Sequence, residues 1–243
     1  MNEARKPLQI GFLVLGLGCL AAVAFSQNSD SSPSTPPASI TPPKPDGGCA
    51  VVGKVTVLPR KVRSSSVSSY AGKSTDRPEP PDPQVSAVWM TGSFPPVDTS
   101  KAEPVILGQR GIQFRPNILV VQVGTPVLFP NFDPIYHSVF SYSAAKKLDL
   151  GRYRPGEERP AVVFDKPGTV SLRCEIHDHM RCEIVVVESP YFATTDAEGN
   201  FRLQGLPAGK HTFRVWLSPK ETVEHTVELK PGETATVDWR SPG

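Results

Sequence analysis

The stretch Cys174-Glu-Ile-His177-Asp-His-Met180 places a thiol, an imidazole and a thioether at Cys-x-x-His-x-x-Met spacing. Side chains alternate between the two faces of a β-strand, so a regular strand cannot aim all three at one point. The segment is therefore predicted to be a turn that follows a strand ending at Arg173. A second imidazole, His137, ends the upstream stretch Asn131-Phe-Asp-Pro-Ile-Tyr-His137. Together these side chains form a ligand set for one metal ion, contributed by two distant segments.

The ligand types favour copper. Two imidazoles and a thiolate with a weak axial thioether are the ligands of a type 1 blue-copper site. Thiolate and thioether suit Cu(I), and imidazole suits both oxidation states. We therefore predict one copper ion bound by His137, Cys174, His177 and Met180. The alternative is zinc bound by Cys174, His177 and Cys182, with or without His137, which leaves Met180 without a role.

Further residues are candidate neighbours of these ligands. Ser138 is predicted to hydrogen-bond to the Cys174 loop and to keep the two ligand segments in register. Asn131 is a second candidate. His179 is expected at the solvent edge of the site, and its imidazole is alternatively a competing ligand. The aromatic side chains expected to keep water from the thiolate are Phe129, Phe132 and Phe140.

These motifs resemble those of the cupredoxins. The Cys174 loop is similar to the short ligand loop of amicyanin-type members, and Phe129-Pro-Asn-Phe-Asp-Pro-Ile-Tyr-His137 resembles secreted bacterial cupredoxin-like proteins labelled "methylamine utilization protein". The similarity runs from about Gln109 to Leu217. It implies a Greek-key β-sandwich and single-electron transfer. The sequence departs from the pattern at His179, where an aromatic residue such as Trp is expected.

Composition favours an all-β protein with linkers. The chain has 243 residues, 27 of them Pro, and a net charge of +2, which is too small to indicate nucleic-acid binding. Residues 1–26 carry Arg5 and Lys6 before an apolar run and read as a signal peptide or, alternatively, an uncleaved N-terminal anchor. Residues 27–48 form a Ser/Pro-rich linker. We therefore expect a bacterial protein exported to the periplasm or beyond, touching the membrane only through this N-terminal segment.

The remaining chain divides into three parts. Residues 104–188 form the predicted cupredoxin domain of short alternating strands. Residues 189–240, with Asp196-x-x-Gly199-x-Phe201, resemble a carboxypeptidase regulatory-like module, but they contain too few strands for a closed sandwich. Residues 49–103 hold two strand candidates around a disordered loop at 64–84. We hypothesise that these strands pair with the C-terminal module, so that a discontinuous second sandwich flanks the copper domain.

Two more features leave alternatives open. Cys49 and Cys182 form an even pair in an exported chain, which suggests a disulfide, and the alternative is two separate buried thiols. Residues 144–160 are basic and polar and are expected to be a loop with a short strand at 148–150. Its basic residues form a solvated face or, alternatively, a docking patch for an acidic redox partner: Lys146, Lys147, Arg152 and Arg154.

Residue types argue against several copper enzymes. Cys174 has no flanking His to reach a trinuclear centre, and its loop has one Cys before its His, unlike a binuclear site. A nitrite-reductase-like second site needs three more His ligands in suitable contexts. The leading hypothesis is thus a non-enzymatic electron carrier with an unidentified redox protein as partner. The alternatives are a copper-sequestering module and a β-sandwich with structural zinc.

Overall fold

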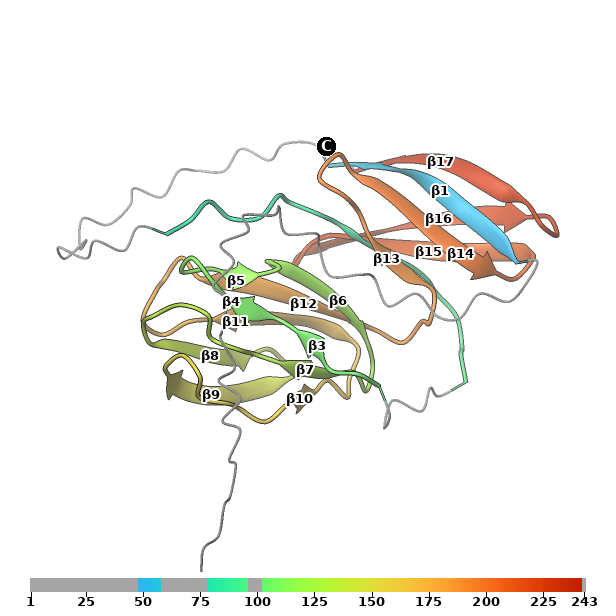
Figure 1. Ribbon diagram of the computed structural model, residues 1–243. Helices are drawn as coiled ribbons and strands as arrows, with labels where there is room; N and C mark the ends of the chain where they lie inside the picture. The colour runs from blue at the N-terminus through green and yellow to red at the C-terminus, as the bar shows by residue number, and fades with distance from the viewer. Residues whose placement is uncertain (1–47, 58–77, 96–101, 242–243) are drawn as a thin grey trace, which may run out of the picture. The chain divides into compact units, whose positions relative to one another are not determined.

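The computed structural model describes residues 48–57, 78–95 and 102–241 (Figure 1). These residues form strands, turns and irregular segments without a helix, so the all-β prediction is confirmed. In this part of the chain, no helix is long and apolar enough to cross a membrane. The predicted export segment 1–26, the linker 27–48 except for its last residue, and residues 58–77 and 96–101 lie outside the described residues.

The first sandwich encloses one apolar core between short strands. Its larger sheet has the order β6 (Ile118–Gln122), β12 (Arg181–Val187), β11 (Gly168–Arg173), β8 (His137–Tyr142) and β9 (Lys147–Tyr153). A smaller sheet has the order β10 (Val162–Val163), β7 (Pro126–Leu128) and β3 (Val105–Ile106), and β4 (Gly108–Gln109) pairs with β5 (Phe114–Arg115). Residues of both sheets, together with Cys174 and Met180, are buried in this core.

Strands β6 and β12 are buried on both faces over most of their length, which explains the apolar runs at 118–121 and 184–187. They pair in parallel, with Ile184 opposite Leu119. One face of each packs into the first core, and the other face packs with Ala87 and Trp216 in a separate cluster. Parallel strands covered on both sides typically read as continuous Val/Ile/Leu runs rather than as an alternation.

Strands from before and after the first sandwich pair with each other. β1 (Cys49–Thr56) lies between β14 (Asn200–Leu206) and β17 (Thr234–Arg240), and Figure 1 shows it in blue among these orange and red strands. β2 (Ala87–Met90) lies between β13 (Phe192–Thr194) and β15 (Gly209–Ser218), and β16 (Glu221–Leu229) completes that sheet. The two sheets share a core in which Trp239 stacks on Phe201 at a centroid distance of 5.1 Å. Both ends of the described chain therefore contribute to one second sandwich.

Of the two alternatives for Cys49 and Cys182, the structure has separate buried thiols. Cys49 and Cys182 are both free, and they lie in different cores. The Cys49 thiol donates to the Lys230 carbonyl at 3.0 Å, and the Cys182 thiol donates to the Pro116 carbonyl at 3.5 Å. Sequence alone cannot assign pairing, and here each thiol fills its own apolar site.

Two predicted loops also differ from the structure. Residues 147–153 form the full strand β9, because Tyr153 is completely buried and its hydroxyl donates to the Phe129 carbonyl at 2.7 Å. Residues 78–84, part of the loop expected to be disordered, are irregular and mostly exposed, and hydrogen bonds connect them to residues 111–117. Arg115 forms ion pairs there with both Glu79 and Asp82 of this Pro-rich segment.

Candidate metal site

The ligand loop is the connection of a β-hairpin. β11 and β12 are antiparallel, and Arg173 pairs with Arg181, so residues 174–180 form the turn between them. Arg173 also pairs with Phe140 of β8, the strand that begins at His137. This register brings the turn and the start of β8 to the same end of the sheet.

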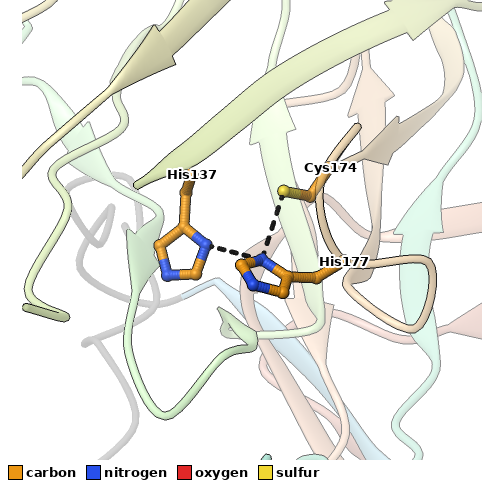
Figure 2. Close-up of side chains that lie close together, drawn as sticks. All are labelled: His137, Cys174 and His177. Carbon is orange, nitrogen blue, oxygen red and sulfur yellow. Dashed lines mark hydrogen bonds between the residues drawn. The ribbon is translucent and has the colours of Figure 1, made fainter. Parts of the chain in front are cut away.

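Three donor atoms converge there (Figure 2). The Nδ1 atoms of His137 and His177 lie 3.1 Å apart, and Cys174 Sγ lies 3.7 Å from His177 Nδ1. All three ligand atoms lie within 4.8 Å of one another. Nitrogens at about 2.0–2.1 Å and a sulfur at about 2.3 Å from one ion are separated by about 3–4 Å, so the spacing fits a single metal ion.

The Cys174 sulfur is prepared to act as a thiolate. Burial raises the pKa of this thiol, but hydrogen bonds from His137 and from backbone amides, including that of Ser138, outweigh burial and lower the pKa to about 5. The Ser138 amide lies 3.4 Å from the sulfur. Because metals bind the thiolate, this environment favours metal binding at neutral pH.

Ser138 also ties the two ligand segments together. Its hydroxyl accepts a hydrogen bond from the Glu175 amide at 2.7 Å and lies 3.7 Å from Cys174 Sγ. The side chain is 2% exposed. The Ser138 hydroxyl therefore links β8 directly to the ligand loop.

Asp133 is a functional residue that the sequence interpretation missed. Its Oδ2 lies 2.8 Å from His137 Nε2, the ring nitrogen that faces away from the donor cluster. Burial raises the Asp133 pKa, but hydrogen bonds from Ile112, His137 and Gly111 outweigh it, so the carboxyl pKa is lowered. Burial lowers the His137 pKa, and the interactions with Cys174 and Asp133 reverse this effect and raise it. A carboxylate at Nε2 fixes the imidazole with Nδ1 directed at the metal position.

Asn131 shapes the loop that carries Asp133. Its Oδ1 accepts from the Asp133 amide at 3.0 Å, and its Nδ2 donates to the Ile135 carbonyl at 2.8 Å and the Tyr153 carbonyl at 3.2 Å. Asn131 thus contacts no donor atom, and it holds the segment that leads to His137.

The other predicted site residues fall into different surroundings. Met180 is completely buried in the core that contains Cys174, and its amide donates to the His177 carbonyl at 2.9 Å. His179 Nε2 lies 3.0 Å from the Ile112 carbonyl and does not join the donor cluster. Cys182, a ligand in the zinc alternative, donates to the Pro116 carbonyl and is not part of the donor cluster. Phe129 is buried in the core that contains Cys174, whereas Phe132 is 52% exposed and lies outside that core.

Comparison with known proteins gives distant structural similarity. The sequence matches no protein-family model, and no curated protein matches it. A Cu-containing nitrite reductase from Thermus scotoductus SA-01 is 28% identical with a TM-score of 0.34, covering 35% of this chain and 23% of that chain. An amicyanin variant in its Cu(I) form is 19% identical with a TM-score of 0.32, covering 41% of this chain and 97% of that chain. An oxidised amicyanin variant is 22% identical with a TM-score of 0.32, covering 35% and 83%. The functional argument therefore depends on the side chains of this chain.

Proposed function

We propose that this protein is an exported type 1 copper protein that carries single electrons between redox partners. The observation that carries this proposal is the convergence of His137 Nδ1, Cys174 Sγ and His177 Nδ1 on one position, with the thiol pKa lowered to about 5. These three residues would hold copper, which would supply one-electron chemistry between Cu(II) and Cu(I).

The surrounding residues suit that task because they keep the donors in place. His137 is completely buried and is held through Asp133, and Cys174 is 4% exposed and is held through Ser138. His177 is only partly buried. Met180 would be the weak fourth ligand, because it ends the hairpin turn inside the core that contains Cys174. Electrons would leave and enter through His177, the donor nearest to solvent.

The remaining imidazoles support a carrier rather than an enzyme with a second copper site. His179 bonds to the Ile112 carbonyl, His211 to the Pro207 carbonyl, and His225 stacks on Trp239 at 4.7 Å. Within the described residues, the one cluster of potential metal ligands is that of His137, Cys174 and His177. We further propose a periplasmic or extracellular location, because residues 1–26 have the pattern of an export signal.

The test uses the exported protein as the cell produces it, stripped of metal and then titrated with Cu(II). We expect an intense thiolate-to-copper band in the visible spectrum, bleached by ascorbate and restored by an oxidant, with a reversible midpoint potential. Cys174→Ser should abolish the band, and the matched variant Cys182→Ser should retain it. If the protein stays colourless and prefers zinc, the cluster has a structural role. Copper binding without reversible reduction would assign it to sequestration.

A further inference from the structure

The turn between β4 and β5 has an unusual residue at its tip. Arg110 and Gln113 exchange backbone hydrogen bonds of 3.0 and 3.2 Å, so Gly111 and Ile112 are the two turn residues. Both have positive φ, 63° and 55°. Such turns favour Asn-Gly, and a β-branched residue with positive φ is a genuine outlier. Strained residues of this kind persist where the surrounding structure holds them, often at functional sites.

Each polar backbone group of Ile112 is engaged with the metal site. Its amide donates to Asp133 Oδ2 at 2.9 Å, beside the Gly111 amide, which donates to Oδ1 at 2.7 Å. Its carbonyl lies 3.0 Å from His179 Nε2. Because a carbonyl can only accept, His179 must carry a proton on Nε2 and donate it. The Ile112 side chain is 7% exposed and packs in the core of the first sandwich.

These contacts form a continuous connection behind the donor cluster. It runs from His137 through Asp133 to Ile112, and from Ile112 through His179 into the ligand loop. Near the other end of this loop, the Glu175 amide is bound by Ser138. The seven-residue turn is therefore attached to the rest of the sandwich at both ends.

We propose that His179 is a positioning residue that anchors the ligand loop to the Ile112 turn. The strained turn is the shared support for Asp133, which orients His137, and for His179, which fixes the loop bearing Cys174 and His177. The proposal rests on the metal site described above and adds a role for an imidazole outside the ligand set. The rings of His177 and His179 lie 6.2 Å apart between centroids, which separates the supporting ring from the donor ring.

The experiment compares His179→Gln with His179→Leu. Gln can still donate an N–H to the Ile112 carbonyl, and Leu cannot. His211→Leu is the matched control, because it removes an imidazole that makes an equivalent 2.9 Å contact with the Pro207 carbonyl in the second sandwich. Readouts are the rate of copper release to a chelator, the electron self-exchange rate, and ¹⁵N NMR of the imidazoles in the metal-free protein.

We expect His179→Leu to release copper about tenfold faster and to exchange electrons more slowly, since removing a residue that supports a ligand typically costs about 10–100-fold in affinity. His179→Gln and His211→Leu should stay close to wild type, and metal-free wild type should show a protected His179 Nε2–H. Equal behaviour of all variants would overturn the proposal. The proposal would also be overturned if His179→Leu and His179→Gln lost copper equally fast and both had an altered visible spectrum. That result would make His179 a ligand. If wild type binds no copper, the proposed function fails. The His179 Nε2–H signal of the metal-free protein then still shows whether His179 anchors the loop to the Ile112 carbonyl.

Discussion

The carboxylate of Asp133 supports His137 from the side opposite the metal position, and Asp133→Asn tests how far this support matters. The side chain accepts three hydrogen bonds, from the Gly111 amide at 2.7 Å, the Ile112 amide at 2.9 Å and His137 Nε2 at 2.8 Å. Its exposed fraction is 10%. Asn has almost the same shape, so the change alters hydrogen bonding and charge with little change in packing.

The expected loss of stability and of metal affinity in Asp133→Asn follows from the donors around the carboxylate. Asn offers one accepting oxygen and one donating NH₂ group, and all three partners donate when His137 Nδ1 is kept free for a metal. The NH₂ group must therefore either face a backbone N–H or force the imidazole proton onto Nδ1, where it blocks the metal. A buried unpaired donor costs about 1–3 kcal/mol. Loss of a group that orients a histidine ligand lowers metal affinity about 10–100-fold, which is about 1.4–2.8 kcal/mol.

The assay is a competition titration in which a chelator of known affinity competes with the protein for Cu(II). Asp149→Asn is the control, because Asp149 is an exposed carboxylate that accepts from the nearby Gly151 amide at 2.9 Å. We expect Asp133→Asn to bind copper at least tenfold more weakly and Asp149→Asn to match wild type. If Asp133→Asn folds normally and binds copper within about twofold of wild type, the orienting role assigned to the carboxylate is refuted.

Two further predictions concern the interior. Burial raises the Glu183 pKa above its usual 4.5, partly offset by the Ser171 hydroxyl. A carboxyl whose pKa rises on folding destabilises the folded state as pH increases above its unfolded pKa. Urea unfolding of metal-free Glu183→Gln should therefore show a higher midpoint than wild type at pH 7 and an equal one below pH 4, and equal midpoints at both would contradict this. Because Cys49 and Cys182 are free, a thiol reductant should leave the Tm of metal-free protein unchanged, and a lowered Tm would indicate a disulfide.

The ligand cluster could be predicted from the sequence because two of its members, Cys174 and His177, stand three residues apart in one loop. Cys174 and His177 can meet His137 only if residues 174–180 form a turn at one end of the sheet, and the hairpin of β11 and β12 has this register. The apolar runs of β6 and β12 likewise reveal strands that are buried on both faces. In both cases the signal lies in the order of neighbouring residues.

Features that depend on contacts between distant segments were not visible in the sequence. Asp133 stands four residues before His137 in an irregular loop, and nothing local shows that amides from another hairpin surround it. Gly111-Ile112 is not a usual pair for a two-residue turn, so its positive φ angles leave no pattern to read. Tyr153 follows a polar, basic stretch, and only its burial shows that β9 is a full strand. The alternation of Leu148 and Leu150 was the available signal for that strand.

The support around the cluster is unequal, and this inequality bears on how the site would exchange electrons. His137 and Cys174 are buried, and each is held by a neighbour outside the ligand set. His177 is partly exposed, and in the described part of the chain its side chain hydrogen-bonds only with the other two donors. Its neighbour Ile176 is 41% exposed. In the proposed electron carrier, a partner docking here would meet the least constrained donor first, and the two deeper donors would keep the geometry that copper needs in both oxidation states. Residues such as Asp133, Ser138 and His179 would then set the properties of the site although none of them binds the metal.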